Sequence, residues 1–179
     1  CWGAPSYVPN SYYPNAEHRE AGKAAKADLS GLDRKVAVMF TGRINDPVVA
    51  EELIKGGYCD LVGMVRAGIA DPEFANKARE GRLNEIRRCI ACTRCIDEAS
   101  ESLYIPYTPV CSINPVIGNE LRWEKEYKRA TQARRVVVVG GGLAGCEAAR
   151  IAAQRGHKVT LLEQGKRLGG QLLIASKAP

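Results

Sequence analysis

The sequence predicts an α/β chain in which parallel strands alternate with helices. Three observations lead to this expectation: two apolar runs that are each followed by a helix start signal, a cluster of cysteines near the middle, and a glycine-rich turn between a third apolar run and a further helix. Two strands cannot close a barrel, and one strand–helix–strand unit cannot bury both of its faces. We therefore expect a fragment that spans the junction between two larger domains.

The composition excludes several classes of protein. The chain has 179 residues, of which 45% are hydrophobic and 26% charged, as in a globular protein. Its net charge is +6, but the basic residues alternate with acidic ones and only 6% of residues are aromatic, which argues against a nucleic-acid-binding module. No apolar run approaches the roughly 18 residues that a membrane span needs. We expect a cytoplasmic protein with a small-molecule substrate, with neither nucleic acid nor membrane as a partner, and a homo-oligomer is compatible with the sequence.

The first half of the chain carries the signals of two consecutive βα units. Residues 35–41 (KVAVMFT) form a near-continuous apolar run, which is typical of a strand buried on both faces, and residues 60–65 predict a second buried strand. A charged, Ala-rich segment at 17–28 predicts a covering helix before them. Strands and helices that alternate with short connections indicate a parallel sheet.

Each of these predicted strands is followed by a helix. Asp46 and Pro47 supply an N-cap and a proline at the first helical position, so we expect a helix over Val48–Lys55. Asp71-Pro72 opens a second helix, which closes near Gly81.

An arginine follows or ends each of the two strands. Arg43 lies in the turn after the first strand, and Arg66 ends the second. Parallel α/β sheets and barrels bind ligands at the carboxyl ends of their strands, and arginine is a bidentate partner of phosphate. Each arginine alone is typical of a surface residue, whereas the pair in equivalent places favours a phosphate site.

The cysteines in the middle of the chain have the spacing of a metal or cluster site. The pattern C-x2-C-x2-C-x15-C comprises Cys89, Cys92, Cys95 and Cys111. Three close thiolates and one remote thiolate favour a 4Fe–4S cluster, because zinc ribbons usually present two separated C-x2-C pairs. Structural zinc and unligated thiols remain the alternatives.

A glycine-rich turn opens the last part of the chain. The sequence GGGLAG at 140–145 follows the apolar strand VVVVG and starts a helix that extends to about Arg155. In this pattern Gly140 permits the tight turn, Gly142 lets the backbone approach a pyrophosphate, and Gly145 allows close packing of helix and strand. Ala144 lies in the same turn. The unit predicts a Rossmann-like dinucleotide-binding site whose phosphates lie at the helix N-terminus.

The segment after this helix supplies two more candidate residues. Glu163 ends the next strand, expected over 158–163, where an acid would bond both ribose hydroxyls and repel a 2′-phosphate. The site is therefore expected to hold FAD, NAD or an ADP-like nucleotide. Gln171 follows Gly169-Gly170 in a second glycine turn that would lie against the same cofactor.

The order of these features resembles the multidomain branch of the old yellow enzyme family of NADH:flavin oxidoreductases, which includes 2,4-dienoyl-CoA reductase, trimethylamine dehydrogenase and histamine dehydrogenase. The segments that carry the resemblance are GRINDPVVAEELI, GMVRAGIADPEF, GRLNEIRRCIACTRC, CSINP and VVVVGGGLAGCEAARIAAQRGHKVTLLE. It implies the last βα units of an FMN-binding TIM (β/α)8 barrel at 1–82, a 4Fe–4S segment and linker at 83–133, and the start of a Rossmann-like FAD- or NAD(P)-binding domain at 134–179.

The resemblance also implies roles for individual residues. Arg43, Val65 and Arg66 match contacts to FMN, the four cysteines match the ligands of the 4Fe–4S cluster, and the remaining candidates fall in the second nucleotide site, namely Gly140, Gly142, Ala144, Gly145, Glu163 and Gln171. The implied enzyme passes electrons between a substrate at FMN, the cluster and the second nucleotide site, with NAD(P)H as an outside donor. Both enoate or dienoyl reduction and amine oxidation fit the family.

Two other interpretations stay open at this point. One is a non-catalytic iron–sulfur protein that transfers electrons or senses redox state, although such a carrier has no need of a dinucleotide site. The other is a zinc-stabilised binding module. No catalytic acid or base is named, because the groups that face the substrate would come from earlier barrel strands.

Overall fold

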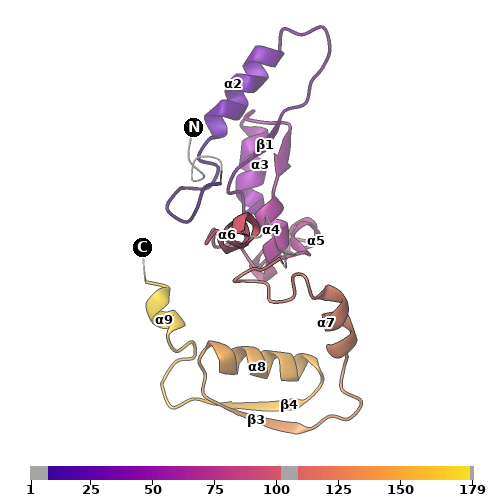
Figure 1. Cartoon of the computed structure of the whole chain (residues 1–179), viewed down its shortest axis with the longest axis vertical. Coiled ribbons are helices and arrows are strands. Elements are labelled where there is room, and N and C mark those ends of the chain that lie inside the picture. The colour runs from indigo at the N-terminus through magenta and orange to yellow at the C-terminus, as the bar shows by residue number, and fades with distance from the viewer. Residues whose placement is uncertain (1–7, 102–108, 178–179) are drawn as a thin grey trace. The chain divides into compact units, whose positions relative to one another are not determined.

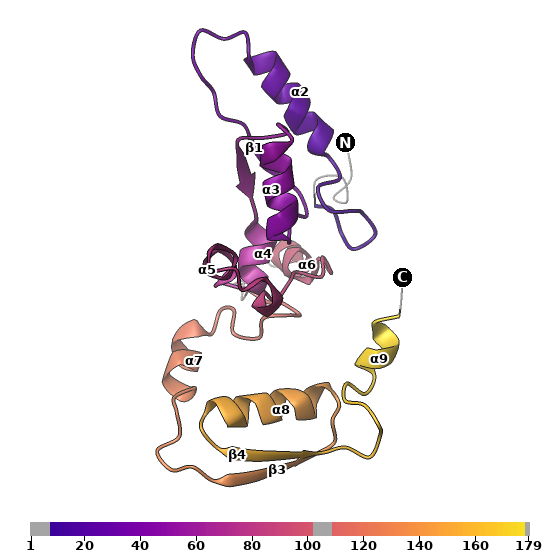
Figure 2. The ribbon, with the colours of Figure 1, turned by 180° about the vertical axis from the view of Figure 1, so that it is seen from behind.

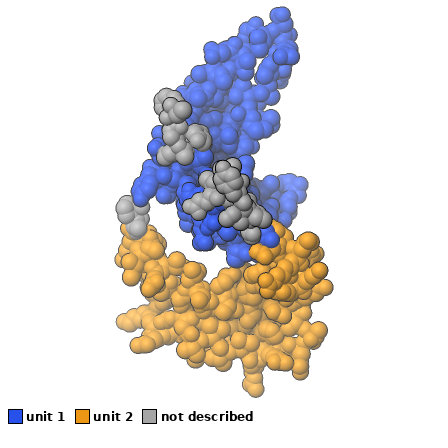
Figure 3. All heavy atoms as spheres, in the orientation of Figure 1, with its two compact units in different colours: residues 1–118 blue, residues 119–179 orange. Residues whose placement is uncertain are grey.

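The structure is a computed structural model that describes residues 8–101 and 109–177. It divides into two compact units, residues 1–118 and 119–179 (Figure 3). The cysteine segment belongs to the first unit and the glycine-rich turn to the second. In the described part of the chain, no helix has the length and apolar character that crossing a membrane requires.

The first unit is built on one parallel βα pair. Strands β1 (Met39–Thr41) and β2 (Leu61–Gly63) pair in parallel, with Met39 opposite Leu61, and helix α3 (Pro47–Lys55) connects them (Figure 1). The side chain of Asp46 accepts a hydrogen bond from the backbone N–H of Val48 (3.0 Å), which confirms the predicted N-cap. The parallel pairing and the connecting helix confirm the predicted βα arrangement.

Further helices precede and follow this pair along the chain. They are α2 (Arg19–Leu29), α4 (Val65–Ala70), α5 (Phe74–Arg79), the 3-10 turn η1 (Leu83–Glu85) and α6 (Arg94–Glu101). Helix α4 differs from the expectation, which placed Val65 and Arg66 at the end of a strand. The strand ladder stops at Gly63, so both residues belong to the first turn of a helix at the carboxyl end of β2.

The core of the first unit lies between α3, β1 and the segment before α2. It consists of the buried residues Ala16, Phe40, Ile44, Ala50, Leu53 and Cys59, and a smaller cluster joins Ala67, Phe74 and Ile86. The predicted burial of both strand faces is wrong for this chain: Met39 is 63% exposed and Leu61 50%. The described elements cover only one face of the two-stranded sheet, so alternate side chains reach solvent.

One buried carboxylate ties the helices to the segment that leads into the cysteines. Asp71 is 1% exposed; its Oδ2 accepts hydrogen bonds from Lys77 Nζ (2.7 Å) and from the backbone N–H of Arg87 (2.9 Å). Burial by itself raises the pKa of Asp71, but the hydrogen bonds from Lys77 and Arg87 outweigh it and hold the pKa below its ordinary value. Asp71 therefore stabilises the fold as an anion.

Replacing Asp71 with asparagine is expected to lower the free energy of unfolding by about 3 kcal/mol, because Lys77 loses its partner in a mostly buried place. Because the pKa of Asp71 is lowered in the folded state, its carboxylate stabilises the fold fully above the unfolded-state pKa of about 3.9. This stabilisation is lost as the pH falls through the folded-state pKa. The free energy of unfolding of the variant should therefore depend less on pH below about pH 4. Urea unfolding of the full-length protein measures both effects. The control is Glu51→Gln, which breaks an exposed pair with Lys55 and should cost less than about 1 kcal/mol; equal losses in the two variants would contradict the prediction.

The second unit is a strand–helix–strand motif. Strands β3 (Arg135–Val139) and β4 (Lys158–Leu162) pair in parallel along their whole length, and helix α8 (Leu143–Gln154) packs on one face of the pair (Figure 2). These bounds confirm the predicted unit to within a residue at the ends of the helix and the second strand. Helices α7 (Glu120–Glu126) and α9 (Leu172–Ala175) precede and follow it.

Candidate functional site

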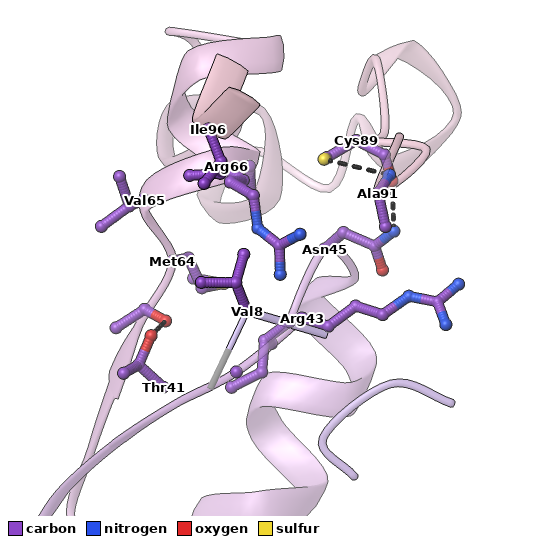
Figure 4. A pocket seen from close by; sticks show the side chains of 14 residues that line it. Val8, Thr41, Arg43, Asn45, Met64, Val65, Arg66, Cys89, Ala91 and Ile96 are labelled. Carbon is purple, nitrogen blue, oxygen red and sulfur yellow. Dashed lines mark hydrogen bonds between the residues drawn. The ribbon is translucent and has the colours of Figure 1, made fainter. Parts of the chain in front are cut away.

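A pocket of about 140 Å³ lies at the carboxyl ends of β1 and β2 (Figure 4). The residues after β1 and the first turn of α4 form its walls, so both predicted arginines reach it. It is lined by Val8, Thr41, Gly42, Arg43, Ile44, Asn45, Gly63, Met64, Val65, Arg66, Ala67, Cys89, Ala91 and Ile96. This end of a parallel sheet is where α/β proteins bind their ligands.

A strained turn presents Arg43 to this pocket. Gly42 has φ +148° and Arg43 itself has φ +48°, a left-handed conformation that a residue with a side chain seldom adopts. The Nε atom of Arg43 is buried and has no hydrogen-bond partner in the described structure. A buried guanidinium N–H without an acceptor fits a site for an anionic group such as a phosphate.

Arg66 enters the same pocket from the other side. Its Nη1 donates a hydrogen bond to the carbonyl oxygen of Pro9 (2.9 Å), which fixes the direction of the guanidinium. Val65, the third residue predicted here, lines the pocket and is 73% exposed. The structure thus brings together all three residues predicted at the strand ends.

The four predicted cysteines line a second, smaller pocket. Cys89, Cys92, Cys95 and Cys111 share it with Arg66, Ile69, Ile90, Thr93, Ser112 and Ile113. None of the four forms a disulfide. The backbone N–H groups of Ala91 and Ile113 donate to the sulfurs of Cys89 (3.3 Å) and Cys111 (3.4 Å). The described residues contain no group of three His, Cys, Asp or Glu residues placed to hold a single metal ion.

Two asparagine side chains join the cysteine segments to the βα framework. The Nδ2 of Asn45 donates to the carbonyl oxygen of Cys89 (2.6 Å), as Figure 4 shows. The Nδ2 of Asn114, which is 3% exposed, donates to the carbonyl oxygen of Ile69 at the end of α4 (2.9 Å). Sequence reasoning missed both asparagines as site residues, although Asn114 directly precedes the proline of the CSINP segment.

Cys95 is partly buried and shares its pocket with the other three cysteines. Burial raises the pKa of the Cys95 thiol, and the neighbouring Cys89 and Cys111 act in the same direction, whereas the positive charge of Arg66 opposes them. The other three cysteines and Arg66 are therefore all close enough to act on the thiol of Cys95.

The second unit contains a pocket of about 680 Å³ at the N-terminus of α8. The predicted Gly140, Gly142, Ala144, Gly145 and Gln171 all line it, together with Val139, Leu143, Gly169, Gly170, Leu172 and Ala175. The two glycine turns therefore face the same space, which the sequence predicted for Gln171. Backbone N–H groups at a helix N-terminus favour an anionic ligand.

Each glycine of the first turn is needed for a different steric reason. Gly140 has φ +99°, which favours glycine. A β-carbon on Gly145 would collide with the carbonyl oxygen of Gly140, so glycine is needed for α8 to approach β3 closely. Gly142 has open space around its α-carbon, and the backbone can approach a ligand there.

Glu163 takes part in the turn and is not among the residues that line the pocket. Its Oε2 accepts from the backbone N–H of Gly141 (2.6 Å) and its Oε1 from that of Gly165 (2.6 Å). The hydrogen bonds from Gly165 and Gly141 hold the pKa of Glu163 below its ordinary value. Each carboxylate oxygen keeps a second acceptor position, so the predicted bonds to a ribose remain compatible with this arrangement.

Two family models match the chain, one in each unit. Residues 12–85 match the NADH:flavin oxidoreductase / NADH oxidase family, and residues 135–178 match the FAD dependent oxidoreductase family. The segment between them contains the four cysteines.

Several known proteins are similar in sequence to most of this chain. It is 47% identical over 146 residues to an NADH oxidase of Thermoanaerobacter brockii, covering 80% of the chain and 22% of that protein. It is 39% identical over 174 residues to N,N-dimethylglycine/sarcosine dehydrogenase of Chromohalobacter salexigens, covering 96% of the chain and 24% of that protein. The solved structure of histamine dehydrogenase from Rhizobium sp. 4-9 superposes with a TM-score of 0.81 and 31% identity, covering 96% of the chain and 24% of that protein.

The fold, the two matches and these relatives place the chain in a family of flavin-dependent oxidoreductases. The chain belongs to the NADH:flavin oxidoreductase / NADH oxidase family, in the multidomain branch that its motifs resemble. It spans about a quarter of the length of the relatives that it matches.

Proposed function

We propose that this chain forms the flavin-phosphate, 4Fe–4S and second nucleotide sites of a flavin- and iron–sulfur-dependent oxidoreductase. One observation carries the proposal: the four-cysteine pocket and the strand-end pocket have Arg66 and Cys89 in common. In this proposal residues 1–82 are the last βα units of a TIM barrel, residues 83–133 the iron–sulfur linker, and residues 134–179 the first βαβ of a Rossmann-like domain.

Arg43 and Arg66 would hold the phosphate of FMN. The orphaned Nε of Arg43 supplies a donor, and the guanidinium of Arg66 adds a second positive charge on the opposite wall. Val65 would contact the flavin from the rim of the pocket. The bound flavin supplies hydride and electron chemistry, while these residues bind and orient it.

Cys89, Cys92, Cys95 and Cys111 would hold the 4Fe–4S cluster. The chemistry of the donors fits: four cysteines line one pocket, two of their sulfurs accept backbone N–H bonds, and three isoleucines line the same pocket. A cluster of this kind supplies one-electron transfer when bound. Asn45 and Asn114 would keep the two cysteine segments at a fixed position relative to the flavin-phosphate pocket.

The second unit would bind FAD or an ADP-like nucleotide. The N-terminus of α8 and the two glycine turns would face the diphosphate, and Glu163 would accept from the ribose hydroxyls. An acid at this position disfavours a 2′-phosphate in this pocket.

The substrate would be a small molecule, and nucleic acid and membranes would not be partners. Two of the relatives named above are amine dehydrogenases and one is an NADH oxidase. Amine oxidation and NAD(P)H-dependent enoate or dienoyl reduction are therefore the reactions to test on the whole protein.

The first test is the cofactor content of the full-length protein purified without oxygen. About four iron and four sulfide per chain, together with FMN, are expected from four cysteine ligands and one strand-end phosphate site. Zinc in the absence of iron and flavin would overturn the proposal and leave a structural module.

Replacing Arg43 with alanine is expected to weaken FMN binding about 10- to 100-fold, because a hydrogen bond to a charged group contributes about 1.5–3 kcal/mol. Fluorescence titration of flavin-depleted full-length protein with FMN measures the dissociation constant. Arg88→Ala is the matched control, since the guanidinium of Arg88 pairs with Asp46 (2.7 Å) and does not line the pocket. Equal FMN affinities in wild type and the Arg43 variant would rule out this role.

A further inference from the structure

Arg66 occupies the wall between the two pockets of the first unit. It lines the strand-end pocket together with Arg43, and it lines the cysteine pocket together with all four cysteines. Figure 4 shows its side chain entering the strand-end pocket from α4, with Cys89 above Asn45 on the same side of the pocket. One guanidinium therefore faces both sites.

The position of Arg66 is fixed at both ends of its side chain. Its backbone belongs to the first turn of α4, and Nη1 donates to the carbonyl oxygen of the buried Pro9 (2.9 Å). One of the five N–H donors of the guanidinium is used in this bond. This bond holds the guanidinium beside both pockets.

Arg66 lines the pocket that the four cysteines share, so its positive charge lies beside that site. Reduction of a cluster adds one negative charge to a site that already holds four thiolates, so a fixed cation nearby favours the reduced state.

We propose that Arg66 is an electrostatic link between the two sites, setting the reduction potential of the cluster and coupling it to the presence of an anion in the strand-end pocket. This inference rests on the proposed function. A phosphate in the strand-end pocket neutralises part of the charge of Arg66, so it lowers the potential of the cluster. By reciprocity, reduction of the cluster increases the attraction between the cluster and Arg66. It therefore weakens the binding of an anion to Arg66 in the strand-end pocket.

The test is a redox titration of the full-length protein, with the cluster followed by its electron paramagnetic resonance signal. Arg66→Gln should change the ratio of oxidised to reduced cluster at a fixed potential about tenfold, a shift of about 59 mV to more negative potential for one electron. Arg66→Lys keeps the charge and should restore most of the wild-type value. The matched control is Arg94→Gln, which removes a cation that adjoins Cys95 in sequence but is 60% exposed and lines neither pocket; it should change the ratio less than about twofold.

A second measurement needs no variant that might lose the cluster. Inorganic phosphate, added to flavin-depleted wild-type protein at constant ionic strength, should lower the reduction potential of the cluster. The inference is overturned if Arg66→Gln keeps the wild-type reduction potential, or if phosphate leaves the potential of the wild-type protein unchanged. It is also overturned if the potential of Arg66→Lys or of Arg94→Gln shifts as far as that of Arg66→Gln. A wild-type protein without iron would instead overturn the proposed function.

Discussion

Replacing Cys95 with alanine is expected to remove the cluster, with iron falling from about four to less than about one per chain, because a cubane needs a thiolate at each of its four corners. Cys95 is a suitable choice, since it lines the four-cysteine pocket and its backbone belongs to helix α6. Alanine is preferable to serine because serine offers a replacement oxygen ligand. Iron and sulfide analysis of the anaerobic full-length protein, with the visible absorption near 400 nm, measures the result.

Cys146 provides the matched control for this experiment. It lies on α8 in the second unit, where its Sγ donates to the carbonyl oxygen of Gly141 (3.2 Å), and it does not line the cysteine pocket. Cys146→Ala should keep the full iron content. If the Cys95 variant also kept about four iron per chain, the assignment of the pocket as a cluster site would be wrong.

Replacing Gly145 with alanine is expected to abolish nucleotide binding by the second unit, with an affinity loss of more than about 100-fold. The added β-carbon would collide with the carbonyl oxygen of Gly140, so α8 must move away from β3 and its N-terminus leaves the phosphate position. Overpacking of this kind also costs about 1–3 kcal/mol of stability. Calorimetric titration with FAD and with ADP measures the affinity, and thermal unfolding measures the stability.

Gly142 separates the steric effect on the fold from the effect on the ligand. A β-carbon there meets no atom within 4 Å, and φ is −71°, so Gly142→Ala should fold with wild-type stability. It should still weaken nucleotide binding, because the new methyl group lies in the pocket that the ligand approaches. Wild-type FAD affinity in Gly145→Ala would contradict the predicted site.

The sequence allowed accurate prediction where the signal is local. The glycine turn, the start of α8 at Leu143 and the paired strands follow from residue types within a few positions of one another, and the bounds agree closely. The gathering of the four cysteines also followed from spacing, because three of them lie within one or two turns of chain. The cofactors and the roles of the individual residues stay predictions until they are measured.

Contacts between distant residues left no such signal. Asn45 bonds the carbonyl of Cys89, and Asn114 bonds that of Ile69, across more than 40 positions in each case. The strand predicted from residue 35 begins only at Met39, because the backbone N–H of Val38 donates to the side chain of Asp60 (2.9 Å), just before the ladder starts. The helix α4 was missed because its apolar residues read as a continuation of the strand.

The side-chain bonds to Arg87 and Cys89 have a consequence for how the cluster is assembled. Asp71 holds the amide of Arg87 and Asn45 holds the carbonyl of Cys89, so the chain on the N-terminal side of the three close cysteines is ordered by the polypeptide alone. The conformational entropy of this part of the site is therefore lost during folding and not when iron binds. A protein stripped of iron should therefore stay folded in its first unit and accept iron and sulfide again without passing through the unfolded chain.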